Sequence, residues 1–135
     1  MGMGSRITKE QTIRIGEKVV IEGPSPSASF CVVFEDDGET GYFYALDMSR
    51  QDDPILDALH IYDVAVVTDR DIPSQVQIVW SGDSHKAALI INEYFHGVFD
   101  FETKRGYCRD GFPRRRGDWC TQAHDWDDRA VDLFR

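Results

Sequence analysis

The stretch SFCVVFEDDGETGYFYALDM, residues 29–48, decides the predicted fold class. Apolar side chains occupy every second position over residues 30–34, and a second alternating run covers residues 42–48. A period of two places alternate side chains on one face of a β-strand. The segment between the two runs is acidic and contains Gly38 and Gly41, which favour a turn. The stretch therefore predicts a β-hairpin.

Further strands are expected along most of the chain. The segments with strand-like patterns are TIRIGEKVVIEG (12–23), QVQIVWS (75–81), KAALIIN (86–92) and YFHGVFDFE (94–102). In the last segment the alternation predicts Phe95, Phe99 and Phe101 on one face, with Gly97 at a bulge or a close backbone approach. The third segment is almost continuously apolar, which indicates a central strand.

Helix is expected at two places only. Asp53 followed by Pro54 resembles a helix start, which predicts a short helix near residues 54–60. The segment DWDDRAVDLFR predicts a C-terminal helix near residues 125–134. The predicted fold is therefore mainly β (α+β with little helix): an antiparallel sheet, as a small sandwich or open barrel of five to seven strands. Residues 1–10 are expected to form a flexible N-terminal tail and residues 11–135 a single β-rich domain.

The formal net charge of −9 is unevenly distributed. Residues 1–103 contain 7 Lys and Arg against 18 Asp and Glu, a balance of −11, whereas residues 104–135 carry a balance of +2. Nucleic-acid binding requires a basic face, so the composition argues against it. An acidic surface of this strength favours association with a basic protein partner.

The sequence also indicates where the protein acts. It has no apolar run of the roughly 18–20 residues that a membrane span requires, and its N-terminus lacks the apolar core of a secretory signal. Three cysteines are an unsuitable number for a disulfide framework. We therefore expect a cytoplasmic protein without membrane contact and without a cofactor. The sequence leaves open whether it is a monomer or a homodimer.

The candidate functional residues lie mostly after residue 95. The sequence contains no established catalytic motif, so the enzyme hypothesis depends on His96 and Cys108 as catalytic candidates and on Tyr107 and Arg109 as ligand-binding candidates. The run of arginines at 114–116 could bind an anion, but nearby aspartates offer it internal partners.

A metal site is a separate candidate. Cys120 and His124 have the spacing of one zinc-ligand pair, and Cys108 is a third candidate ligand. Zinc requires four ligands, so the sequence provides only part of a site. The alternative is that these are ordinary buried or loop residues.

Residues 58–113 resemble an uncharacterised bacterial family that is known only as a domain of unknown function. The residues that carry the resemblance are HIYDV (60–64), Trp80-Ser81, KAAL (86–89), His96, VFDF (98–101) and GYCR (106–109). The resemblance implies a small bacterial domain and supplies no activity, cofactor or catalytic residue.

Three functional hypotheses follow. The first is a non-enzymatic acidic binding domain that acts on a protein partner, of which an immunity-type protein masking a basic toxin is one concrete form. The second is a small enzyme or ligand-binding domain centred on His96, Tyr107, Cys108 and Arg109. The third is a zinc-stabilised structural domain.

Overall fold

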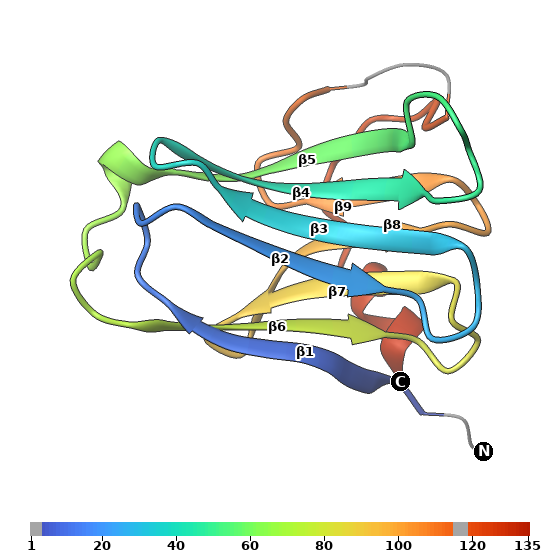
Figure 1. Cartoon of the computed structure of the whole chain (residues 1–135), viewed down its shortest axis with the longest axis horizontal. Coiled ribbons are helices and arrows are strands. Elements are labelled where there is room, and N and C mark those ends of the chain that lie inside the picture. The colour runs from blue at the N-terminus through green and yellow to red at the C-terminus, as the bar shows by residue number, and fades with distance from the viewer. Residues whose placement is uncertain (1–3, 115–118) are drawn as a thin grey trace.

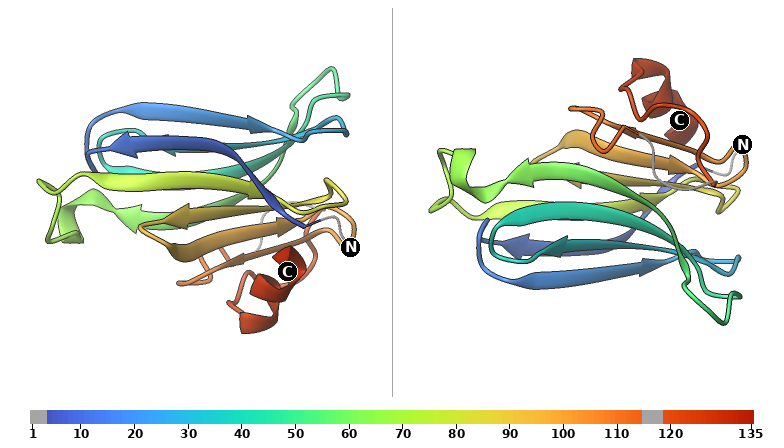
Figure 2. Two further views of the ribbon diagram at one scale, coloured as in Figure 1. Left: turned by 90° about the horizontal axis from the view of Figure 1, so that it is seen from below. Right: turned by 90° about the horizontal axis from the view of Figure 1, so that it is seen from above.

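Two antiparallel β-sheets pack face to face in a computed structural model that describes residues 4–114 and 119–135 (Figures 1 and 2). The five-stranded sheet has the order β1 (Arg6–Ile13), β6 (Ser74–Trp80), β7 (Lys86–Ile91), β8 (Tyr94–Asp100) and β9 (Arg105–Cys108). The four-stranded sheet has the order β2 (Val19–Pro24), β3 (Phe30–Asp36), β4 (Thr40–Asp47) and β5 (Ile55–Asp63). The prediction of a mainly β antiparallel fold is confirmed, and the arrangement is a sandwich rather than a closed barrel.

The hairpin at residues 29–48 is confirmed as β3 and β4, and its acidic turn serves the backbone. The carboxylate of Asp37 accepts hydrogen bonds from the backbone N–H groups of Glu39 and Thr40, both at 2.9 Å. Buried Asp36 accepts from the N–H groups of Gly16 and Gly38 and from the Tyr62 hydroxyl. The turn carboxylates are therefore occupied by donors of the protein itself.

The core between the sheets is aromatic. Trp80 and Phe43 are fully buried, and the Phe43 ring stacks on Phe99 with 5.3 Å between centroids. The Trp80 indole N–H donates to the carbonyl of Gly23 at 3.2 Å, which satisfies its one polar group in the interior. Burial of these rings removes a large apolar area from water and favours the closed sandwich.

A bulge in β8 corrects the predicted face of Phe95. The register shifts between Leu89 and Ile90, so Phe95 pairs with Ile90 on the outer side while Phe99 faces the core. The prediction that Phe95 and Phe99 share a face is wrong, because one extra residue in a strand reverses the alternation beyond it. The predicted close approach at Gly97 is confirmed, since a Cβ atom there would lie 3.2 Å from the Phe43 ring.

The predicted helix at residues 54–60 is wrong, because this segment is strand β5. Asp53 has a φ of 41°, whereas an N-cap residue is extended. Pro54 precedes the first paired residue of the strand, so its missing N–H removes no hydrogen bond from the ladder. Its carbonyl accepts a hydrogen bond from Asp47 N–H at 2.9 Å. Ladder bonds to β4 and burial of Leu59 therefore override the helix-start signal.

Two other boundaries also differ from expectation. Residues 6–10, expected in a flexible tail, belong to β1 and pair with β6. The part of the chain that the structure describes contains nine strands, more than the predicted five to seven. The two strands that were not predicted are β5, which was assigned to a helix, and β9, which has only four residues.

The C-terminal segment is helical, as predicted, although it begins at Asp128 rather than near residue 125. Element η2 (Asp128–Phe134) is a 3-10 helix whose N-cap, Asp127, accepts from Arg129 N–H at 2.9 Å. It lies on the outer side of the five-stranded sheet (Figure 2), where Ala130 and Phe134 are buried against apolar strand residues. A single 3-10 turn, η1 (Val64–Val66), follows β5. None of the helices in the described ranges is long and apolar enough to cross a membrane.

Candidate functional site

The four residues of the enzyme hypothesis do not converge on one site. Cys108 faces the core opposite Gly97 and is fully buried, whereas Tyr107 lies on the other face of β9 beneath η2. Burial raises the pKa of the Cys108 thiol to about 12, with a further contribution from Asp110. A thiol in this environment is protonated at neutral pH and is a poor nucleophile.

His96 and Arg109 are neighbours, but their contacts favour a packing role. The Arg109 guanidinium lies between two rings, 4.2 Å from the centroid of Tyr94 and 3.8 Å from that of Trp126. Its Nε donates to the carbonyl of Phe95 at 2.8 Å. Burial, and then the charge of Arg109, lower the pKa of His96 to about 4. The imidazole is therefore neutral at pH 7 and only weakly basic.

The metal candidates are brought together in part. The side chains of Cys120 and His124 lie close to that of Asp57, with their ligand atoms within 4.8 Å of one another, and all three residues are buried. Cys108 is not in this group, since its sulfur lies 3.5 Å from a carboxylate oxygen of Asp110. Asp57 was not a sequence candidate, because its nearness to His124 depends on a contact across 67 positions.

The geometry of this group favours an ion pair. His124 Nε2 lies 2.8 Å from Asp57 Oδ2, and its Nδ1 contacts the carbonyl of Pro113. Both ring nitrogens therefore face acceptors, which requires a doubly protonated imidazolium. Two ligand atoms on one tetrahedral zinc ion would stand about 3.3 Å apart, farther than this hydrogen bond. Burial lowers the pKa of His124, but the hydrogen bonds with Asp57, Cys120 and the Pro113 carbonyl, together with the charge of Asp57, outweigh burial and raise the pKa to about 10.

This ion pair anchors the chain after β9 against β5. Cys108 N–H donates to the carbonyl of His124 at 3.0 Å, and His60 N–H donates to that of Phe112 at 2.8 Å. The segment that carries Asp110 and Phe112 is thereby held along the edge of the four-stranded sheet. Of the arginine run, residues 115 and 116 lie outside the described residues.

The outward side of the four-stranded sheet, which we call the open face, was not identified from the sequence. Cross-strand register defines it as three rows of side chains. The rows are Val20–Glu35–Tyr42–His60, Glu22–Val33–Tyr44–Ala58 and Pro24–Cys31–Leu46–Ile55. The corresponding face of the other sheet is covered by η2, whereas in the described ranges no helix covers the open face (Figure 2).

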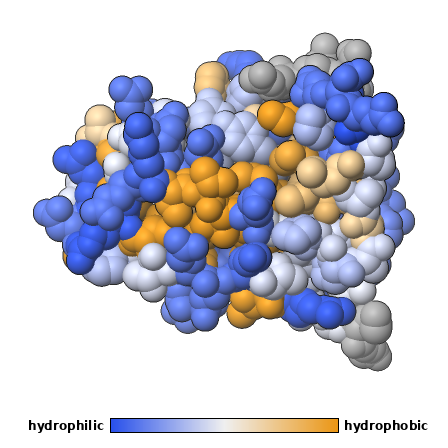
Figure 3. All heavy atoms as spheres, in the orientation of Figure 1, coloured by the Kyte–Doolittle hydropathy of each residue, from blue (hydrophilic) through white to orange (hydrophobic). Residues whose placement is uncertain are grey.

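Apolar side chains are concentrated on the open face. Val20 is 57% exposed and Ile55 44% exposed, while Val33, Tyr44 and Leu46 are half-buried. Figure 3 shows an apolar patch at the centre of this side of the molecule, over β2 and β3, with hydrophilic side chains around it. Contiguous apolar surface rimmed by polar groups is typical of an interaction site.

A chain of aromatic contacts runs along one end of the open face. Tyr44 stacks on Tyr42 at 6.0 Å, Tyr42 meets His60 edge-on at 5.4 Å, and His60 meets Phe112 at 5.9 Å. The two ring nitrogens of His60 contact the carboxylates of Asp63, at 2.9 Å, and Asp110, at 2.5 Å. Partial burial lowers the pKa of His60, but these two carboxylates outweigh it and leave the pKa above its ordinary value.

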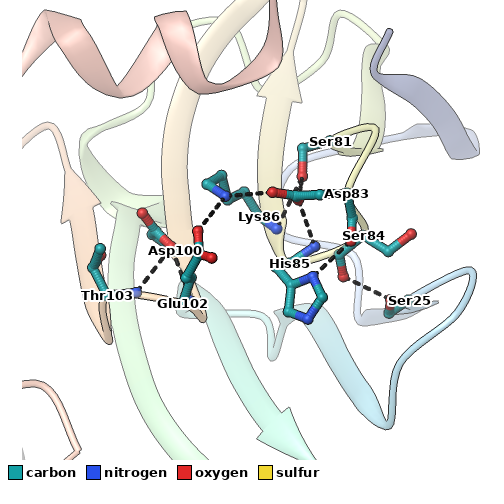
Figure 4. Close-up of polar contacts among 9 residues, drawn as sticks. All are labelled: Ser25, Ser81, Asp83, Ser84, His85, Lys86, Asp100, Glu102 and Thr103. Atoms are coloured by element: carbon teal, nitrogen blue, oxygen red, sulfur yellow. Dashed lines mark hydrogen bonds and ion pairs between the residues drawn. The ribbon is translucent and has the colours of Figure 1, made fainter. Parts of the chain in front are cut away.

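The polar cluster around Lys86 has a structural role (Figure 4). Lys86 Nζ lies 2.6 Å from an oxygen of Asp83 and 3.1 Å from one of Glu102, so it joins the β6–β7 turn to the segment after β8. The Ser81 hydroxyl donates to Asp83 at 2.6 Å and accepts from Lys86 N–H at 3.1 Å. Burial lowers the pKa of the Lys86 amine, but its hydrogen bonds with the two carboxylates have the larger combined effect, so the pKa is raised overall. The amine therefore stays protonated and is not a base.

Comparison with known proteins identifies the family. No solved structure matches the chain. An uncharacterized protein of Haemophilus influenzae is 46% identical over 85 residues, which are 63% of this chain and 53% of that protein. The chain therefore matches about half the length of that relative. A family model described as an uncharacterized protein conserved in bacteria matches residues 13–135. The chain belongs to this bacterial family, DUF2251.

Proposed function

We propose that this protein is a non-enzymatic binding domain that uses the open face to bind a basic protein partner. The observation that carries the proposal is the difference between the two outward faces of the sandwich. One face buries its apolar residues under η2. On the other face Val20 is exposed, and Tyr42, Tyr44 and Leu46 are only half-buried. Tyrosine-rich apolar surface is typical of interface centres.

The charge of the open face supports a basic partner. Glu22 and Glu35 lie within the rows of the face, and neither makes an ion pair within the described part of the chain. Asp63 and Asp110 flank His60 at one end. A partner with Lys or Arg around an apolar centre would be complementary, and its association would be fast and salt-sensitive.

The same charges argue against a second copy of the chain as the occupant. A two-fold symmetric dimer through the open face would place the same acidic patch on both subunits. Glu22 and Glu35 would then approach like charges on the other subunit, which is unfavourable when they are desolvated. The proposal therefore commits to a different protein.

An immunity-type protein that masks a basic toxin site is the concrete form that we propose, acting in the cytoplasm. The three cysteines are free thiols, as a reducing compartment would keep them. A gene for a basic secreted or cytotoxic protein beside this gene would support the immunity form. Without such a neighbouring gene, the immunity form would lose its support, and the capture experiment below would test only whether the open face binds a basic protein.

The test is affinity capture from the native bacterium with three baits. The baits are the wild-type chain, Val20→Lys on the open face, and Val66→Lys, which makes the same change at a residue 74% exposed in η1. We expect the wild type and V66K to capture the same basic protein, and V20K to lose it. Capture of a partner to the same extent by V20K, or capture of no partner by the wild type, contradicts the proposal.

The salt dependence provides an independent measurement. With the captured partner purified, the association rate constant should fall steeply with ionic strength, and Glu35→Gln should reduce that slope. A rate constant that does not change with salt would contradict the proposed electrostatic complementarity. Analytical ultracentrifugation of the chain alone checks the self-association alternative, since a dimer that V20K dissociates would assign the open face to a second copy.

A further inference from the structure

A cavity of about 440 Å³ lies between β9, the β8–β9 turn and η2. Its polar lining consists of Asp100, Thr103, Arg105, Tyr107, Gln122, Asp127 and Arg129. Volumes of this order hold small molecules in proteins. Residues of β9 and η2 line the cavity. Because η2 lies on the outer side of the five-stranded sheet, away from the four-stranded sheet (Figure 2), the cavity is separate from the open face.

Arg105 is the unusual group in this lining. Its guanidinium carbon lies 4.8 Å from the ring centroid of Tyr107, which fixes the plane of the side chain. Its Nε is buried and meets no hydrogen-bond acceptor among the described residues. Buried polar groups nearly always have a partner, and a guanidinium N–H is a strong donor. Because Nε has almost no accessible surface, a ligand in the cavity would meet the other guanidinium N–H groups, and Arg105 makes no ion pair within the described residues.

The acidic residues beside Arg105 are already engaged. Asp127 binds Arg129 at 2.8 Å and caps η2. Asp100, the cross-strand partner of Arg105, uses one carboxylate oxygen to accept the N–H groups of Glu102, at 3.0 Å, and Thr103, at 3.2 Å (Figure 4). These bonds hold the turn that forms one wall of the cavity.

We propose that this cavity binds a small ligand through an oxyanion, a carboxylate or a phosphate group, with Arg105 as the principal contact. The guanidinium fork matches the oxygens of either group. The Tyr107 hydroxyl and the Gln122 amide supply further donors from the cavity lining. Burial raises the pKa of Tyr107, so its hydroxyl remains protonated and can donate at neutral pH. Tyr107, a ligand-binding candidate from the sequence, therefore keeps that role in the proposal. The arginine that would bind the ligand is Arg105 rather than Arg109.

The test is an NMR titration of the protein with two probes, inorganic phosphate and acetate, at constant ionic strength. We expect a saturable shift of the Arg105 Nε–H resonance with at least one probe. Arg105→Gln should weaken that binding by about tenfold or more, the loss expected when a hydrogen bond to a charged group is removed. Arg50→Gln, which removes the same charge from an exposed residue in the β4–β5 connection, should leave it unchanged.

The outcomes separate the sources of the oxyanion. Tighter binding of phosphate assigns the site to a phosphate-bearing ligand, and tighter binding of acetate assigns it to a carboxylate. Arg105→Lys keeps the charge but loses the planar fork, so it should bind more weakly than the wild type and more tightly than R105Q. The absence of saturable binding of both probes by the wild type overturns the proposal. Equal binding by R105Q, with an unchanged melting temperature, also overturns it.

Discussion

Removing one partner of the buried Asp57–His124 pair should destabilise the protein strongly. In Asp57→Asn the imidazole loses its counter-charge, and a neutral ring has only one N–H to donate, either to the new amide oxygen or to the carbonyl of Pro113. Both partner side chains are fully buried, so neither can recover hydration. Breaking a buried ion pair on one side costs about 3–5 kcal/mol. That is a large part of the total of about 5–15 kcal/mol that holds a domain of this size.

The pH dependence of stability tests the protonation of His124 in the folded protein. The folded pKa of His124, about 10, is above its ordinary 6.5, so the stabilisation is complete below pH 6.5. It declines as the pH rises from 6.5 to 10, because the folded state then holds a proton that the unfolded state has released. At 1.36 kcal/mol per pKa unit, the shift corresponds to a loss of about 5 kcal/mol over that pH range.

The assay is urea unfolding followed by tryptophan fluorescence between pH 6.5 and 9. We expect the free energy of unfolding of the wild type to fall across this range. His124→Gln should be less stable at pH 6.5 and should show a flatter profile, which separates His124 from other groups that titrate there. Cys31→Ala, which removes a buried thiol on the open face and outside the pair, is the control and should keep the wild-type slope. A D57N variant within about 1 kcal/mol of the wild type, together with a flat wild-type profile, would refute the reasoning.

Three further predictions concern the core, the thiols and the Lys86 cluster. Gly97→Ala should lower the free energy of unfolding by about 1–3 kcal/mol, because the new methyl group must displace the Phe43 ring; urea unfolding measures this, and an unchanged midpoint would contradict the close approach. All three cysteines should resist a thiol reagent in the native protein and react in urea, because burial protects them; fast native labelling of any of them would contradict their burial. Lys86→Met should lower the melting temperature more than Lys104→Met, which changes an exposed residue and serves as the control. Without Lys86, Asp83 and Glu102 face each other without a cation. Equal melting temperatures of the two variants would show that the cluster contributes nothing to stability.

The sequence by itself determined the class of fold, because strand periodicity is a local property. The alternation at residues 29–48 predicts the β3–β4 hairpin, and the aspartates before the final apolar residues predict the helical C-terminus. Gly97 predicts a bulge or a close backbone approach because glycine has no Cβ atom, although the sequence does not say that the neighbour is the Phe43 ring.

Only the tertiary structure decided the features that depend on distant partners. Residues 55–63 became a strand because β4 supplies ladder bonds that outweigh the local helix signal. Phe95 turned outward because a bulge opposite Ile90 reverses the alternation. The meeting of Asp57 and His124, the open face and the cavity beside Arg105 all follow from how separate segments pack. Such contacts have no periodicity in the chain, since they are set by the docking of the sheets and of η2 rather than by neighbouring residues.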